Sequence, residues 1–228
     1  ISKWLGLPKE NIFLTEGVSS AIKSIIECYT LPGKNNIIFP HPTFAMYSVY
    51  CKMFNLKQRK INYNKNHQLN FDLLLKSIDK KTAVVFLPNP NIPIEGTLGK
   101  KKILKILNRC RKFKVILAID EVYYPFSGYT SLNLIKKHKN LLVMRSFSKA
   151  YGLAAIRLGY ILGNANNIDY ISKTRTAYES NSYSLEVASF FMNHKSEVFR
   201  YIKDVKYGFK YFKKKLDIYD IKYNGGKD

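Results

Sequence analysis

The sequence is poor in the residues that build metal centres, disulfide frameworks and membrane spans. Its 228 residues include only three cysteines and four histidines, and neither set has metal-ligand spacing. No apolar run approaches the roughly 20 residues that a transmembrane helix needs, and the first residues lack a signal-peptide pattern. These absences argue against a metal site, a disulfide scaffold or a membrane partner, so a protein of the reducing cytoplasm is expected.

Acidic residues are also scarce, with 16 Asp and Glu against 38 Lys and Arg, a formal net charge of +22. Such a charge can attract nucleic acid, anionic membranes or phosphorylated ligands. The lysines are scattered over almost every segment, however, and no recognised nucleic-acid motif accompanies them. We therefore interpret the charge as solvated surface and expect no nucleic-acid partner. A basic nucleic-acid-binding module is kept as the rival from another functional class.

Both ends of the sequence look cut. The first residue is Ile1 rather than Met, and the last segment contains the turn-like pair Gly225 and Gly226. We expect a piece of a longer chain that lacks an N-terminal arm and a C-terminal domain.

Short apolar runs alternate with longer segments of helical spacing, and hydrophobic residues make up 46% of the chain. The runs are rich in β-branched residues and predict buried strands at 37–39, 83–87, 115–119, 141–144 and 158–162. Helices are predicted at 19–28, 42–53, 71–78, 100–111, 131–136 and, mostly helical, 184–216. This alternation predicts a three-layer α/β/α fold with a mostly parallel sheet. We expect a large domain over residues 1–183, followed by a connecting helix and the start of a smaller domain over 184–228.

In such a sheet, ligands bind beyond the carboxyl ends of the strands. The residues that follow three of the predicted strands have complementary chemistry. An amide follows the first strand, a carboxylate with a phenol follows the second, and an amine follows the third: Asn91, Asp120 with Tyr123, and Lys149. The sequence therefore predicts a ligand site at this edge of the sheet.

One cofactor, pyridoxal phosphate, requires such a set. It needs an amine for a Schiff base with its aldehyde and a carboxylate that keeps its pyridine nitrogen protonated. It also needs a donor to its phenolic oxygen and an anion pocket for its phosphate. The candidates are Lys149 for the amine, Asp120 for the carboxylate, Tyr123 with Asn91 for the donor, and Ser146 with Arg157 for the anion pocket.

The segment 146–160, Ser-Phe-Ser-Lys-Ala-Tyr-Gly-Leu-Ala-Ala-Ile-Arg-Leu-Gly-Tyr, resembles the lysine segment of fold-type I pyridoxal-phosphate-dependent aminotransferases. The similarity is strongest to the histidinol-phosphate aminotransferase branch. Three upstream motifs occur in the family's order, at 15–22, 41–47 and 120–123. The resemblance covers roughly residues 6 to 183.

The resemblance implies a role for each candidate residue. Lys149 would hold the cofactor and then move the proton in the 1,3-shift, with Asp120 facing the pyridine nitrogen. Phe44 would stack on the ring, and the backbone N–H groups of Val18 and Ser19 would join Ser146 and Arg157 at the phosphate. The implied activity is transfer of an amino group from an amino acid or a histidinol-phosphate-like donor to a 2-oxo acid such as 2-oxoglutarate. Family members are homodimers, so the complete chain is expected to be one.

The pattern departs from the family in two places. The loop 89–96 lacks the usual Pro-Thr-Gly, so Asn91 is our choice for the cofactor contact and Asn89 stays an alternative. Glu179 stands where the family usually has Asn, beside Tyr178 and Asn181, which we expect on the substrate side. The donor is therefore open, and an aminotransferase of secondary metabolism or surface-sugar biosynthesis would also fit. A decarboxylase of the same fold, of the threonine-phosphate type, would share every cofactor residue.

Overall fold

The computed structural model describes residues 1–94, 96–176 and 180–223. Its centre is a seven-stranded sheet with the order β1-β7-β6-β5-β4-β2-β3. The strands are β1 (Ile12–Thr15), β2 (Asn36–His41), β3 (Lys57–Asn62), β4 (Thr82–Pro88), β5 (Ile116–Asp120), β6 (Leu141–Ser146) and β7 (Gly159–Gly163). Strand β7 runs opposite to the other six strands, so the mostly parallel sheet that the sequence predicts is confirmed.

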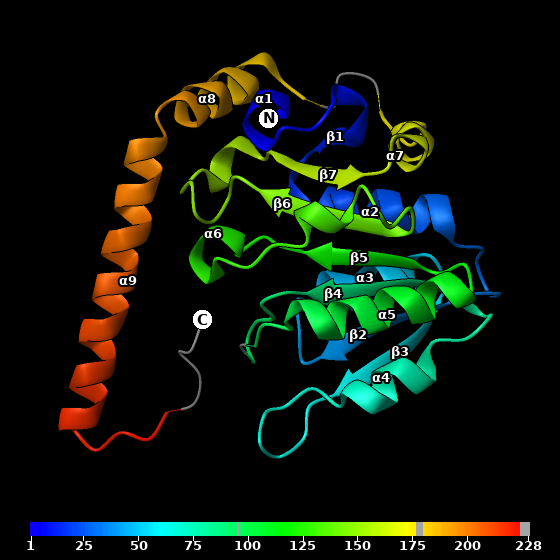
Figure 1. Cartoon of the computed structure of the whole chain (residues 1–228), viewed down its shortest axis with the longest axis horizontal. Helices are drawn as coiled ribbons and strands as arrows, with labels where there is room; N and C mark the ends of the chain where they lie inside the picture. Colours follow the sequence, from blue (N-terminus) through cyan, green and yellow to red (C-terminus); the bar gives the residue numbers. More distant parts are fainter. Residues whose placement is uncertain (95, 177–179, 224–228) are drawn as a thin grey trace.

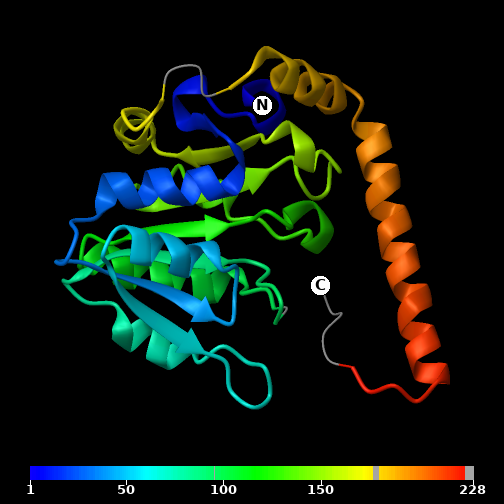
Figure 2. The ribbon, with the colours of Figure 1, turned by 180° about the vertical axis from the view of Figure 1, so that it is seen from behind.

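Helices cover both faces of the sheet, as Figures 1 and 2 show from opposite sides. One face carries α2 (Gly17–Tyr29), α3 (Met46–Met53) and α7 (Ala165–Ser172), and the other carries α4 (Phe71–Ser77) and α5 (Lys100–Lys112). Each face has its own hydrophobic core. Along β5, Ile116 and Ala118 belong to the core under α2, α3 and α7, whereas Leu117 and Ile119 belong to the core under α4 and α5. This alternation follows from the two-residue period of a strand. It explains why a strand buried on both faces reads as an unbroken apolar run.

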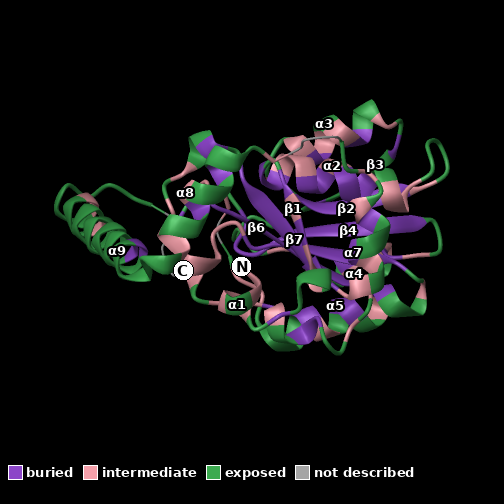
Figure 3. Ribbon diagram, turned by 90° about the horizontal axis from the view of Figure 1, so that it is seen from above, coloured by how far each residue is buried: buried purple, intermediate pink, exposed green. Residues whose placement is uncertain are grey.

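The strands that carry the candidate residues lie in the middle of the sheet. Every residue of β4, β5 and β6 is buried, and these strands are neighbours in the order β6-β5-β4. Figure 3 shows the central strands as the most completely buried part of the molecule. Their carboxyl ends lie at one edge of the sheet, on the side of α6 (Tyr124–Ser127) and α9 (Lys195–Ile218) in Figure 1.

Some expected boundaries were wrong. The segment 131–136 forms only the 3-10 turn η2 (Leu132–Leu134), because so short a segment scarcely exceeds the costly first turn of a helix. Helix α3 begins at Met46 rather than at Pro42. Strands β1 and β3 were not predicted. Strand β3 lies at the edge of the sheet and buries only Ile61, so it has no apolar run to detect.

The C-terminal part is helical, as predicted, but it is divided into α8 (Ser182–Asn193) and α9. His194, with φ of −107° and ψ of 53°, ends the first helix and begins the second. Helix α9 buries only Val198 and Ile202 and runs alongside the carboxyl edge of the sheet, apart from the strands (Figure 1). The domain boundary at 183/184 stays a prediction. Among the described helices, none combines the length and the apolarity needed to cross a bilayer.

Candidate active site

A cavity of about 280 Å³ lies at the carboxyl edge of the central strands. It is lined by residues that follow β4, β5 and β6 and by the start of α2. Eight of the sequence-predicted residues line it: Val18, Ser19, Phe44, Asp120, Tyr123, Ser146, Lys149 and Arg157. The structure thus brings the amine, the carboxylate and the cationic guanidinium to one cavity, although they are separated by up to 37 residues along the chain.

Asp120 is the buried acid of this cavity. Its side chain is 3% exposed, and its two oxygens each accept a hydrogen bond, from the Tyr47 hydroxyl at 2.8 Å and from the Val122 N–H at 3.1 Å. Burial raises the pKa of Asp120 to about 6, while the hydrogen bonds from Tyr47 and Val122 and the charge of Lys149 act in the opposite direction. A buried carboxylate with a raised pKa is one that a cationic ligand would stabilise in its ionised form.

Lys149 is the cavity's amine. It follows β6 in the loop before η3 (Ala154–Ile156), and its side chain is exposed. Its Nζ lies 5.5 Å from the centroid of the Tyr123 ring, a cation–π distance. The amine that follows β6 and the phenol that follows β5 are therefore side by side, as their positions after neighbouring parallel strands require.

The third wall is suited to an anion. Helix α2 begins at Gly17, its N-cap residue Glu16 makes no side-chain capping hydrogen bond, and its first turn lines the cavity with Gly17, Val18 and Ser19. Such a helix start suits an anion. The Arg157 guanidinium lies beside this helix end, with Nη2 3.5 Å from the Glu16 carbonyl oxygen. Gly17 has a φ of 74°, and a Cβ there would be 3.0 Å from Arg157 Nη2. Ser146 accepts a hydrogen bond from the Ser148 N–H at 3.0 Å, which leaves its own O–H as a donor.

Asn91 is placed differently from the other predicted residues. It is buried, but it is absent from the described residues that line the cavity. Its Oδ1 accepts a hydrogen bond from Thr43 at 2.6 Å, and its Nδ2 donates to the carbonyl oxygens of Pro42 and Ile94. Asn89 is likewise engaged, with Leu98, through both ends of its amide. Both side chains hold loops, and the predicted cofactor contact of Asn91 stays a prediction.

Of the residues predicted to stack on the ring or to contact substrate, the structure describes Phe44 and Asn181. Phe44 is 47% exposed at the mouth of the cavity, in edge-to-face contact with Tyr47 at 6.2 Å. Asn181 caps α8 by accepting from the Ser184 N–H at 2.8 Å, and it lines a neighbouring hollow with Arg157. Tyr178 lies outside the described residues.

Sequence reasoning assigned no role to Tyr47, although the motif at 41–47 ends on it. Its hydrogen bond to Asp120 joins residues 73 positions apart, so nothing local could have revealed it. Seven further lining residues carried no prediction: Thr43, Pro88, Pro90, Ile92, Val122, Ser148 and Ala154. Most of them are neighbours of predicted residues, which is the signal that could have found them.

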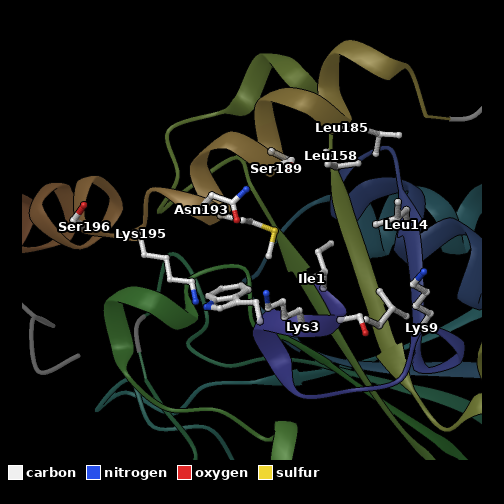
Figure 4. A pocket seen from close by; sticks show the side chains of 15 residues that line it. Ile1, Lys3, Lys9, Leu14, Leu158, Leu185, Ser189, Asn193, Lys195 and Ser196 are labelled. Carbon is white, nitrogen blue, oxygen red and sulfur yellow. The ribbon is translucent and has the colours of Figure 1, made fainter.

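A second, larger cavity of about 870 Å³ lies elsewhere, between the N-terminal segment and α8. Figure 4 shows its lining, with Leu14 and Leu158 at the sheet and Leu185 and Lys195 from the C-terminal helices. None of the predicted site residues that the structure describes lines it. Over the described ranges, no group of three or more His, Cys, Asp or Glu side chains could hold a metal ion.

The fold is α/β with a mostly parallel sheet, and one cavity at its carboxyl edge is lined by a lysine, a buried carboxyl group and a guanidinium. Residues 1–226 match the family model for aminotransferases of class I and II, and the chain belongs to that family. It is 31% identical over 189 residues to a histidinol-phosphate aminotransferase of Caldanaerobacter subterraneus, covering 82% of this chain and 53% of the relative. A histidinol-phosphate aminotransferase of Bacteroides thetaiotaomicron is 34% identical over 207 residues, or 90% of this chain and 59% of the relative.

The fold is similar to that of a putative histidinol-phosphate aminotransferase from Erwinia carotovora, with a TM-score of 0.87 at 20% identity. That match covers 96% of this chain and 65% of the solved one. The chain therefore spans between half and two thirds of the length of these relatives.

Proposed function

We propose that this protein is a pyridoxal-phosphate-dependent aminotransferase that takes its amino group from an amino acid or a histidinol-phosphate-like donor and passes it to a 2-oxo acid such as 2-oxoglutarate. The observation that carries the proposal is the single cavity shared by Lys149, Asp120 and Arg157. Membership of the aminotransferase family and the names of the similar relatives support the same reading.

The donor set of the cavity fits the cofactor. A volume of about 280 Å³ gives room for one substituted ring. A buried acid whose pKa burial raises to about 6 suits a ring nitrogen that carries a proton, because the positive charge restores the ionised form. The uncapped start of α2, the Ser146 hydroxyl and the Arg157 guanidinium suit a phosphate dianion.

When bound, pyridoxal phosphate supplies an aldehyde and an electron-withdrawing ring that stabilises negative charge on the substrate carbon. Lys149 would supply the amine that holds the cofactor aldehyde, and its Nζ would then take up and return the proton of the substrate carbon. Asp120 would keep the ring nitrogen protonated, and Tyr123 would donate to the ring's phenolic oxygen. Arg157, Ser146 and the N–H groups of Val18 and Ser19 would hold the phosphate, and Phe44 would cover the ring.

The cofactor proposal is tested by absorbance. Addition of pyridoxal phosphate to the purified protein should produce a visible band that borohydride bleaches, with covalent attachment to a peptide that contains Lys149. The Lys149→Ala variant should lack the band, whereas Lys139→Ala, which removes another exposed lysine, should retain it. A band that survives in Lys149→Ala would contradict the proposal.

The reaction is tested separately from the cofactor. With candidate donors and 2-oxoglutarate, formation of glutamate supports amino transfer, whereas release of carbon dioxide from the donor would support the decarboxylase instead. Salt-sensitive DNA binding by a protein that shows no cofactor band would support the nucleic-acid-binding alternative. We further infer a homodimer in the cytoplasm, which sedimentation of the complete protein and cell fractionation would test.

A further inference from the structure

The side chain directly behind the acid of the cavity is the phenol of Tyr47. It comes from α3, is fully buried and donates its hydroxyl proton to Asp120 Oδ2 at 2.8 Å. Asp120 lines the cavity, whereas Tyr47 is not among its described lining residues. The phenol therefore supports the carboxylate from the protein side and leaves the cavity side of Asp120 open to a ligand.

Three aromatic rings hold this phenol in place. Phe39 from β2 is stacked on it at 5.8 Å between centroids, Phe86 from β4 lies at 5.1 Å, and Phe44 meets it edge-on at 6.2 Å. A ring packed on several sides has few alternative rotamers. The position of the hydroxyl is therefore set by the core on this face of the sheet.

The two hydrogen bonds to Asp120 fix the plane of its carboxylate. Tyr47 occupies one lone pair of Oδ2, and the Val122 N–H occupies one of Oδ1. A carboxylate oxygen has two lone pairs, so each oxygen can still accept one further donor. A hydrogen-bond donor also favours the ionised over the protonated carboxyl group, against the effect of burial.

We propose that Tyr47 is a positioning residue that keeps Asp120 ionised and oriented, so that the proton shared with the cofactor stays on the ring nitrogen rather than on the carboxyl group. This inference rests on the proposed function. It assigns Tyr47 no contact with substrate or cofactor. Burial and the negative charge of Asp120 both raise the pKa of Tyr47 well above its ordinary value, so the phenol keeps its own proton and remains a donor.

The test removes only the hydroxyl. In Tyr47→Phe, pyridoxal-phosphate affinity should fall by about 10- to 150-fold, the range for losing one hydrogen bond to a charged group. The NMR signal of isotope-labelled ring nitrogen in the bound cofactor should move at neutral pH toward the unprotonated position. Tyr29→Phe is the matched control, since the described residues offer the Tyr29 hydroxyl no hydrogen-bond partner although it is buried. It should change neither quantity.

A double-variant cycle separates positioning from packing. If Tyr47 acts through Asp120, adding Tyr47→Phe to Asp120→Asn should change cofactor affinity less than twofold. If Tyr47→Phe lowers cofactor affinity in the Asp120→Asn variant as much as in the unaltered protein, Tyr47 has a merely structural role and the inference is overturned. An unchanged nitrogen signal in Tyr47→Phe would overturn it as well. If instead the unaltered protein forms no Lys149-dependent band, the proposed function itself fails and the inference falls with it. Circular dichroism and urea unfolding of each variant identify any that is not folded, and Tyr47→Leu, which also lacks a donor and does not overpack the site, then repeats the cycle.

Discussion

Glu121 and Arg145 form a buried ion pair that joins the carboxyl ends of β5 and β6, with 2.9 Å between Arg145 Nη2 and Glu121 Oε2. Glu121 also accepts hydrogen bonds from the Thr130 hydroxyl and the Ser131 N–H, and the Arg145 guanidinium lies 4.0 Å from the centroid of the Tyr124 ring. Glu121 directly follows the cavity's carboxylate, and Arg145 directly precedes the cavity's serine. The pair therefore holds together the two strand ends that build the site.

Loss of this pair should be costly to stability. Glu121→Gln leaves the Arg145 charge buried without its partner, so we expect the free energy of unfolding to fall by about 3–5 kcal/mol. Urea denaturation measures the change. Glu27→Gln is the control, because its ion pair with Lys23 is partly exposed on a helix surface and should matter by less than about 0.5 kcal/mol. Equal effects of the two substitutions would show that the buried pair contributes nothing special.

Asp120 should destabilise the protein when no cofactor is bound. Because burial raises its pKa to about 6, the folded protein holds this proton more tightly than the unfolded chain does. The stability from this group is therefore present in acid and is lost as pH rises from about 4 to 6. Asp120→Asn should raise the free energy of unfolding by about 1–3 kcal/mol at pH 8, and the gain should vanish near pH 3.

Urea denaturation of the cofactor-free protein at both pH values measures this difference. Asp204→Asn, an exposed change on α9, should stay within about 0.5 kcal/mol of the unaltered protein at each pH. A loss of stability in Asp120→Asn at pH 8 would contradict the expectation.

Gly159 allows β7 to approach the start of α2. A Cβ at this position would lie 2.8 Å from the Gly17 carbonyl carbon and 2.9 Å from the Arg145 carbonyl oxygen, both backbone atoms. Gly159→Ala should therefore lower the free energy of unfolding by about 1–3 kcal/mol and weaken phosphate binding at the displaced helix end. Gly208→Ala, in α9 with open space around its Cβ, should instead stabilise by up to about 1 kcal/mol. Thermal unfolding of both variants measures these changes. An unchanged free energy of unfolding in Gly159→Ala would refute the close approach.

Arg157 should recognise the phosphate rather than the ring. In Arg157→Gln, affinity for pyridoxal phosphate should fall about 10- to 100-fold through loss of charge-assisted hydrogen bonds, whereas affinity for pyridoxal, which has no phosphate, should hardly change. Absorbance titration with both ligands measures the difference. Arg111→Gln, an exposed change on α5, controls for net charge. Equal losses for both ligands would place Arg157 outside the anion pocket.

Most of the fold could be predicted because the central strands are buried on both faces. Their apolar runs are local signals, and the polar residue after each run marks the edge where a ligand binds. Strand β1, with four residues, and the polar edge strand β3 have no such signal. Asn91 illustrates the limit for the site. It follows a strand and was predicted to contact the cofactor, whereas its amide bonds to Thr43 and to loop carbonyls, which no local pattern indicates.

The order of residues along the chain determined which chemistry is available: an amine, an acid and a guanidinium, each after a strand or close to one. Only the tertiary structure decided what surrounds them. The phenol of Tyr47 behind Asp120, the Arg145 partner of Glu121 and the close approach of Gly159 to Gly17 all join segments at least 24 residues apart. Contacts of this kind depend on how strands are ordered and how helices pack across them, and that arrangement leaves no trace in a local pattern.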